Sequence, residues 1–364
     1  MKHQIRFIFF FFSLCLSLVS GLAIAGFDEG LAAVEKGNFA KALREFRPLA
    51  TQGNADAQLY LGTLYSTGLG VQQDHREAMK WYRLAADQGN INAQNMMGAL
   101  YTEGKGVQQD YNEAVKWYRL AADQGGDLAM FYLGVMYEKG RGVPQDDKEA
   151  LKWFRLAADQ GNAWAQNNLG MMYYSGQGVP QDYKEAAKWL RLAADQGNAS
   201  AQKNLGLMYD NGKGVPQDYK EAAKWYRLAA DQGNAWAQNN LGRMYYSGQG
   251  VPQDYKEAVK WLRLAADQGN AWAQNALGLM YESGQGVPAS RVVAYALYNI
   301  SAAADSSSET GALANRTTLS ESMSAKEVEA AQNLTREMAK PENLLKALIK
   351  YVKKPSVNRP PKAN

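Results

Sequence analysis

Residues 161–196 of this 364-residue chain read GNAWAQNNLGMMYYSGQGVPQDYKEAAKWLRLAADQ, and residues 233–268 read GNAWAQNNLGRMYYSGQGVPQDYKEAVKWLRLAADQ. The two segments differ only where Met171 becomes Arg243 and Ala187 becomes Val259. Glycines recur at a constant step of 36 residues, at positions 53, 89, 125, 161, 197, 233 and 269. Self-similarity at a fixed period of this size is the signature of a stacked repeat array. The chain is therefore predicted to be one elongated all-α solenoid.

One unit of 36 residues is predicted to be a helical hairpin. Gly161 ends the preceding helix in the left-handed conformation, and Asn162 caps a first helix, helix A. Residues 176–180 carry two glycines and a proline, so they form a turn. Asp182 and Glu185 have the spacing of a capping box at the start of helix B. The apolar positions at helical spacing are Ala165, Leu169, Met172 and Tyr173 in helix A, and Ala186, Leu190, Ala193 and Ala194 in helix B. Gly170 is predicted to let the two helices approach closely.

The repeated motifs are Ala-Gln-x-x-Leu-Gly-x-Met-Tyr, Gly-x-Gly-Val-Pro-Gln-Asp and Glu-Ala-x-Lys-Trp-x-x-x-Ala-Ala-x-x-Gly. This pattern resembles the Sel1-like repeat, a relative of the tetratricopeptide repeat, in seven copies over residues 53–305. The resemblance implies a right-handed α-solenoid of stacked antiparallel helix pairs that serves as a protein-binding scaffold. Bacterial members of the family are similar to periplasmic or secreted adaptors.

The two ends of the array depart from the repeat pattern, as caps should. Residues 26–52 are expected to form an N-terminal helical cap, a degenerate half-repeat that covers the first helix A. Residues 306–340 are expected to form a C-terminal helical cap, in which Ser324 and Glu327 make another capping box. Residues 341–364 are expected to be a basic, largely disordered tail with one short helix-prone stretch.

Residues 1–25 are predicted to be a signal peptide. Lys2 and Arg6 precede an apolar run, and Ala23-Ile24-Ala25 has the small-x-small pattern of a cleavage site. An uncleaved membrane anchor is the alternative, because residues 7–25 are just long enough to span a bilayer. Either reading predicts export, with a periplasmic or secreted location.

The composition excludes several kinds of chemistry. Cys15 and His3 lie in the leader, so the remaining chain has no cysteine and only His75. It therefore cannot form a disulfide or a Cys/His zinc site, and no metal or cofactor is predicted. The whole chain has a net charge of +4, which falls to +2 without Lys2 and Arg6. This near balance gives no reason to expect a nucleic-acid partner.

Differences between the copies point to a candidate binding surface. In helix A the variable positions are those of Trp164, Asn167, Met171 and Tyr174, which are 3, 4 and 3 residues apart and so form one stripe. Solenoids bind partners on their concave side, and the stripe is assigned to that side. The predicted groove residues are Leu128, Phe131, Trp164, Asn167, Met171, Tyr174, Trp236, Asn239, Arg243, Tyr246 and Trp272.

The nine tryptophans divide into two sets. Six occupy a constant helix B position and are interpreted as packing: Trp81, Trp117, Trp153, Trp189, Trp225 and Trp261. The other three are Trp164, Trp236 and Trp272, and three interpretations of them stay open. They contact a partner, they fill a groove between stacked repeats, or they are incidental products of duplication.

Little in the sequence suggests catalysis. Ser200 and Lys203 fit the Ser-x-x-Lys pattern of penicillin-recognising enzymes, but the accompanying Ser-Asp-Asn and Lys-Thr-Gly motifs are absent. The question arises because some cysteine-rich relatives of the family that the chain resembles have been linked to β-lactam binding. The sequence therefore predicts a non-enzymatic scaffold that binds a protein or peptide. The alternative is a cell-wall protein that binds or hydrolyses β-lactams or glycans.

Overall fold

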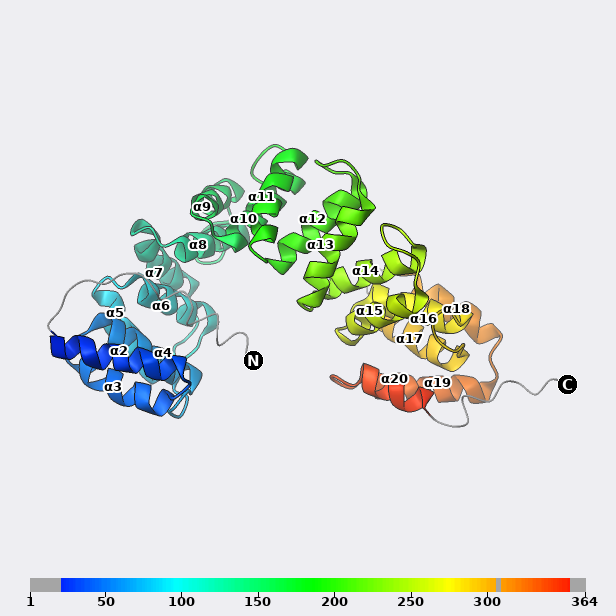
Figure 1. The fold of residues 1–364 in the computed structure, drawn as a ribbon, viewed down its shortest axis with the longest axis horizontal. Helices are drawn as coiled ribbons and strands as arrows, with labels where there is room; N and C mark the ends of the chain where they lie inside the picture. Colours follow the sequence, from blue (N-terminus) through cyan, green and yellow to red (C-terminus); the bar gives the residue numbers. More distant parts are fainter. Residues whose placement is uncertain (1–20, 306–308, 354–364) are drawn as a thin grey trace. The chain divides into compact units, whose positions relative to one another are not determined.

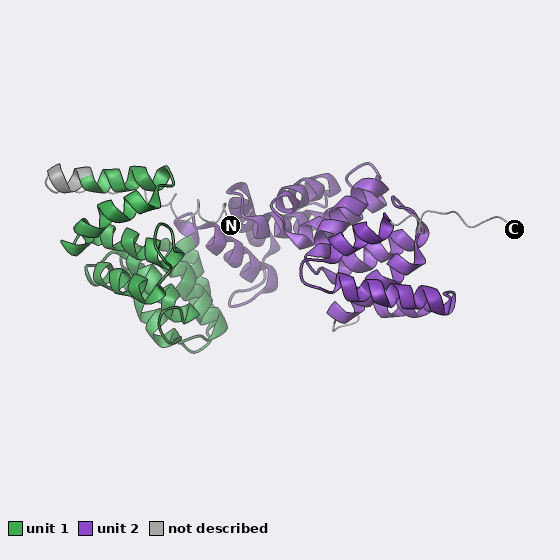
Figure 2. Ribbon diagram, turned by 90° about the horizontal axis from the view of Figure 1, so that it is seen from below, with its two compact units in different colours: residues 1–157 green, residues 158–364 purple. Residues whose placement is uncertain are grey.

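The computed structural model describes residues 21–305 and 309–353, and these residues form helices joined by short turns (Figure 1). Helices adjacent in the sequence pack as pairs, which confirms the predicted all-α solenoid of helical hairpins. The chain divides into two compact units, residues 1–157 and residues 158–364 (Figure 2). Each unit is described by itself.

The helices alternate between helix A and helix B of successive repeats, after one pair that precedes the array. The helices up to the unit boundary are α2 (Gly21–Glu35), α3 (Phe39–Thr51), α4 (Ala55–Thr67), α5 (His75–Asp87), α6 (Ile91–Glu103), α7 (Tyr111–Asp123), α8 (Asp127–Lys139) and α9 (Asp147–Asp159). The remaining repeat helices are α10 (Ala163–Ser175), α11 (Tyr183–Asp195), α12 (Ala199–Asn211), α13 (Tyr219–Asp231), α14 (Ala235–Ser247), α15 (Tyr255–Asp267), α16 (Ala271–Ser283) and α17 (Arg291–Ala304). Three more helices follow: α18 (Ala312–Glu321), α19 (Ala325–Met338) and α20 (Leu344–Val352).

The predicted signals at the ends of helix A are confirmed. The Asn162 side chain accepts a hydrogen bond from the backbone N–H of Ala165 at 3.0 Å, and Gly161 has φ +91°. Gly176 ends α10 in the left-handed conformation, at φ 77° and ψ 26°. These caps satisfy backbone groups that have no partner inside the helix, so each repeat begins and ends at a fixed residue.

Helix B begins with only half of the predicted capping box. The Asp182 carboxylate accepts hydrogen bonds from the backbone N–H groups of Lys184 and Glu185, at 2.9 and 3.0 Å. The backbone N–H of Asp182 is already bonded to the Tyr173 carbonyl, at 2.9 Å, so it is not the partner of Glu185. Glu185 instead accepts a hydrogen bond from the indole N–H of Trp189, at 3.0 Å. The full reciprocal box forms at Ser324 and Glu327.

Within each hairpin, a helix A glycine sets the distance between the two helices. A Cβ on Gly170 would lie 2.8 Å from the Leu190 side chain, and one on Gly206 would lie 2.7 Å from the Tyr226 ring. The predicted role of Gly170 in close helix contact is confirmed, because no larger side chain fits without movement of the partner helix.

Neighbouring hairpins stack through the constant tryptophan of helix B. Trp225 is 4% exposed and belongs to the same core cluster as Leu190 of the preceding hairpin. The Arg191 guanidinium lies 5.1 Å from the centroid of the Trp225 ring and donates a hydrogen bond to the Tyr209 hydroxyl. Trp117 and Trp261 are also buried, which confirms the packing interpretation at these positions.

Buried glutamines connect each hairpin to the one before it, except in the repeat where Met130 takes their place. The Gln202 amide donates to the Ala194 carbonyl at 3.1 Å, and its Oε1 accepts from Gln232 Nε2 at 2.7 Å. These two bonds join the end of α11 to α12, and α12 to the end of α13. The same position is at most 4% exposed in the other copies that carry glutamine, Gln58, Gln94, Gln166, Gln238 and Gln274.

The N-terminal cap is a two-helix hairpin, not the half-repeat that was expected. α2 packs on α3. A Cβ on Gly30 would collide with the Phe46 ring, so Gly30 allows close helix contact here, as Gly170 does beside Leu190 in a complete repeat. The Phe46 ring stacks on Tyr60 of α4, with centroids 5.0 Å apart. The predicted leader lies outside the described residues, apart from the backbone of residues 21–25 at the start of α2.

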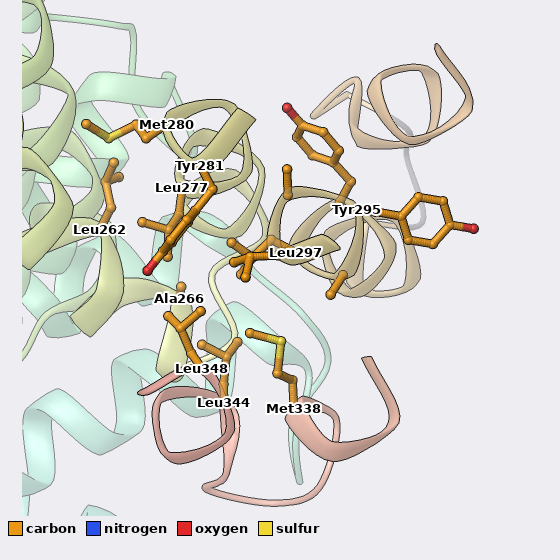
Figure 3. Packing of buried hydrophobic residues seen from close by; sticks show 14 of the residues in the cluster. Leu262, Ala266, Leu277, Met280, Tyr281, Tyr295, Leu297, Met338, Leu344 and Leu348 are labelled. Carbon is orange, nitrogen blue, oxygen red and sulfur yellow. The ribbon is translucent and has the colours of Figure 1, made fainter. Parts of the chain in front are cut away.

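At the C-terminal end, α18, α19 and α20 cover the last repeat. Figure 3 shows Leu344 and Leu348 of α20 beside Ala266 of α15, in one buried cluster. The backbone N–H of Leu345 donates to the Asp267 carboxylate at 3.0 Å. Residues 344–352, which the sequence placed in a basic tail, therefore form a packed helix. Residues 354–364 lie outside the described residues.

Replacing a connecting glutamine should loosen the stack. Gln202→Leu keeps the volume but leaves Gln232 Nε2 and the Ala194 carbonyl without these partners, so it should lower the free energy of unfolding by about 1–3 kcal/mol. Urea unfolding followed by circular dichroism measures this. Gln249→Leu is the control because Gln249 is exposed, and it should change stability by no more than about 0.5 kcal/mol. Equal losses in both variants would contradict the connecting role.

The glycines of the turns are expected to differ in tolerance. Gly233 has φ +90°, and a Cβ added there would point into open space, so Gly233→Ala should cost about 1–2 kcal/mol through backbone strain alone. Gly250 has φ +71°, and a Cβ there would collide with the Tyr219 carbonyl of the preceding hairpin. Gly250→Ala should therefore cost at least about 2 kcal/mol more. Chemical denaturation of both variants tests the order, and a reversed order would refute this account of the turn.

Candidate functional site

The variable tryptophans lie on the surface of the second unit. We call the positions equivalent to Trp164, Asn167, Met171 and Tyr174 in each repeat the helix-A stripe. Trp164, Trp236 and Trp272 are 44%, 54% and 37% exposed, whereas the helix B tryptophans Trp225 and Trp261 are 4% and 5% exposed. An indole with more than a third of its surface in water keeps a large area for a contact.

The other stripe residues of the second unit are accessible to different degrees. Arg243 and Tyr246 are exposed, and Met171 and Tyr174 are half-buried. In the first unit, Leu128 and Phe131 of α8 are half-buried as well. The Phe131 ring lies 5.3 Å from Tyr132 and 6.0 Å from Phe154, so part of its surface is used within its own hairpin.

The asparagine position of the stripe serves the stack, which corrects part of the predicted groove. Asn239 is only 2% exposed and has almost no surface to offer a partner. Asn167 accepts a hydrogen bond from Asn204 of the next hairpin at 3.0 Å. Asn275 is bonded to the C-terminal cap, donating to the Thr310 carbonyl at 2.7 Å. The reason is geometric, because this position faces the neighbouring hairpin.

The last stripe position is coupled to the core of its own hairpin. The hydroxyl of Tyr298 on α17 donates to Glu282 at 2.6 Å. Where helix B carries leucine in place of that tyrosine, the stripe itself carries tyrosine: Tyr174 with Leu190, and Tyr246 with Leu262. This pairing was missed from the sequence, although comparing the two positions copy by copy reveals it.

A shallow pocket of about 290 Å³ opens on the stripe between α12 and α14. Its lining includes Asp210, Arg243, Tyr246, Ser247 and Gln249. Burial raises the pKa of Asp210, while the hydrogen bond from Tyr226 and the charge of Arg243 partly oppose that rise. The pocket therefore holds both an acidic and a basic group beside an exposed aromatic ring.

Ser200 and Lys203 lie on the same helix, α12, with Ser200 exposed and Lys203 half-buried. Burial lowers the pKa of Lys203. The structure gives these two residues no hydrogen bond to each other, so their geometry does not add to the Ser-x-x-Lys pattern.

Two properties of residues 21–305 and 309–353 bear on other functions. In these ranges no three His, Cys, Asp or Glu side chains are placed to hold a metal ion together. Within the same ranges no helix has the length and apolar character needed to cross a membrane.

Stacked hairpins with a variable, partly aromatic helix A surface define an α-helical repeat protein of the interaction type. The family model for the Sel1 repeat matches seven segments, residues 55–90, 91–126, 127–162, 165–198, 199–234, 237–270 and 273–306. The chain belongs to the Sel1 repeat family.

One solved structure agrees with this assignment. The chain is similar to a Sel1 repeat protein from Oxalobacter formigenes, with 34% identity and a TM-score of 0.60, over 67% of this chain and 96% of that one. It is also similar to a protective antigen of uropathogenic Escherichia coli strains, with 29% identity and a TM-score of 0.44, over 94% of this chain and 89% of the antigen. Of the two, the first bears on the fold. The comparison with curated proteins gave no match.

The pocket carboxylate should make stability depend on pH. The raised pKa of folded Asp210 means that the wild-type fold loses stability as the pH rises through that pKa, above the unfolded value of about 3.9. Asp210→Asn keeps an acceptor for the Tyr226 hydroxyl and cannot ionise. The variant should therefore be more stable relative to wild type at pH 7 than at about pH 3.5. Melting temperatures of both proteins measure this, and a difference that grows at low pH would contradict it.

Proposed function

We propose that the protein is an exported, non-enzymatic scaffold that binds a protein or peptide partner along the helix-A stripe of its second unit. The observation that carries the proposal is the exposure of Trp164, Trp236 and Trp272 on helices whose constant positions are buried. Folding alone gives little reason to keep these indoles in water, whereas partner binding would bury them.

The chemistry of the stripe supports a protein partner. Tryptophan, tyrosine, methionine and arginine are the residue types enriched at protein interfaces, and tryptophan and arginine are frequent hot spots. The stripe presents all four types on rigid helices, so little conformational entropy is lost when they bind. The proposed contact residues of the second unit are Trp164, Met171, Tyr174, Trp236, Arg243, Tyr246 and Trp272. Leu128 and Phe131 offer an additional apolar patch on the first unit.

Export is part of the same proposal and rests on the predicted leader. The charged start, apolar run and small-residue end of residues 1–25 support secretion into or across the envelope. Partners of the matching kind are a membrane sensor, an envelope enzyme or a host protein. The alternative, a cell-wall protein that binds or hydrolyses β-lactams or glycans, predicts labelling by fluorescent penicillin that Ser200→Ala abolishes.

The affinity for the partner should depend on Trp164 and Trp236. In the native envelope, crosslinking followed by mass spectrometry should identify a partner. Its dissociation constant should rise at least about tenfold for the double variant Trp164→Ala plus Trp236→Ala, since hot-spot truncations cost about 2 kcal/mol or more.

The matched control is Leu192→Ala plus Leu264→Ala. These leucines lie on helix B and are 48% and 39% exposed, so the control removes a comparable exposed apolar surface away from the stripe. Circular dichroism should show unchanged helicity for both variants. Retained binding by the tryptophan variant, or melting of its fold, would overturn the proposed surface.

A further inference from the structure

A basic side chain in the turn of one hairpin lies over a tyrosine that begins helix B of the preceding hairpin. In the first unit, the Arg141 guanidinium lies 5.4 Å from the centroid of the Tyr111 ring. In the second unit, the Lys213 ammonium lies 5.2 Å from the centroid of the Tyr183 ring. Each cation follows its tyrosine by 30 residues, so the two contacts are copies of one arrangement. In both copies, the tyrosine ring at the start of helix B contacts a cation.

The contact is more elaborate at Lys213, because a second ring takes part. The Tyr174 and Tyr183 rings meet nearly edge to face, with centroids 5.1 Å apart and an interplanar angle of 63°. The Lys213 ammonium lies 4.9 Å from the Tyr174 centroid and donates a hydrogen bond to the Tyr174 hydroxyl at 2.9 Å. The Tyr174 hydroxyl thus accepts a hydrogen bond from the ammonium group, and both rings lie within cation–π distance of it.

The same pair of rings recurs 72 residues further on, without its cation. The Tyr246 and Tyr255 centroids are 5.4 Å apart, and the rings are inclined by 58°. The residue equivalent to Lys213 is Gln285, which is neutral and accepts a hydrogen bond from the Ser283 hydroxyl at 3.0 Å. Among the described residues, no Lys or Arg lies over either ring of this pair. Tyr246 is 40% exposed, so the pair is accessible from the stripe.

We propose that the Tyr246–Tyr255 pair is a binding site for a lysine side chain of the partner, with the ammonium placed as Lys213 is placed between Tyr174 and Tyr183. The occupied copy within the same chain shows which ligand this ring geometry accepts. A neutral glutamine in the turn leaves the two electron-rich rings without a neighbouring positive charge, and an incoming ammonium supplies it. The inference rests on the proposed function, since it names one chemical feature of the partner.

A titration with a small ligand tests the site without the partner. The probe is Nα-acetyl-lysine methylamide, and the neutral norleucine analogue is its control. With tyrosine rings labelled for NMR, the lysine probe should shift the Tyr246 and Tyr255 ring resonances in a saturable way, and the norleucine analogue should not. Equal responses to both ligands would overturn the proposal.

Two substitutions should act in opposite directions. Gln285→Lys places an ammonium in the chain's own turn, so it should weaken probe binding at the Tyr246–Tyr255 pair at least fivefold by competition. Lys213→Gln empties the other pair, so the Tyr174 and Tyr183 resonances should begin to respond to the probe. Unchanged probe binding in both variants would refute the inference, and either expected change supports it.

The partner then separates this inference from the proposed function. If Gln285→Lys leaves partner affinity unchanged while the tryptophan double variant loses it, the stripe binds a partner but no lysine enters this site. If neither variant affects partner affinity, the proposed binding surface itself fails. A fivefold or larger loss with Gln285→Lys supports both.

Discussion

The bonds of a buried glutamine, present in every repeat except the one that carries Met130, are the constraint on which most of the stacked architecture depends. Gln202 uses its donor on the end of the preceding helix B and its acceptor on a glutamine at the end of its own hairpin. When both the donor and the acceptor of a buried amide are hydrogen-bonded, the amide fixes both the rotation and the distance between successive hairpins. An alternative register would leave buried polar groups without hydrogen-bond partners. The series of glutamine hydrogen bonds ends at the last repeat. Position 304, which corresponds to Gln232, is alanine, and the buried Oε1 of Gln274 has no hydrogen-bond partner among the described residues.

A stack held this firmly makes the helix A surface rigid, and it also limits which residues there are available. Asn239 varies in type between copies yet is buried against the next hairpin. Tyr174 and Tyr246 occur in the copies where helix B carries leucine. A stripe position can therefore differ between repeats for two reasons. Its side chain adjusts to the packing of a neighbouring helix, or it is exposed and available to contact a partner. The residues that remain exposed, above all the three tryptophans, Arg243 and Tyr246, are the ones still available to contact a partner.

The sequence predicted the local structure well because caps, turns and helical periodicity are short-range properties. Asn162, Gly161, Gly170 and the helix B tryptophans Trp117, Trp225 and Trp261 have their predicted structural roles. It was less informative wherever a residue's role is set by a contact outside its own helix. The reciprocal box at Asp182 was wrong because the Tyr173 carbonyl already binds the Asp182 N–H. The burial of Asn239 and the packing of α20 on α15 are likewise tertiary effects that one repeat does not reveal.

The two most similar repeats illustrate why identity of sequence is not identity of site. Residues 161–196 and 233–268 differ at two positions, and both contain the same pair of tyrosine rings. What distinguishes the pairs is the following repeat, which brings Lys213 to one and Gln285 to the other. In a solenoid, each surface site is completed by the next hairpin, so duplication of a repeat copies half of a site and leaves the other half to its new neighbour. Chemical diversity along the stripe can then arise from single substitutions in the turns, where they do not disturb the packed helices.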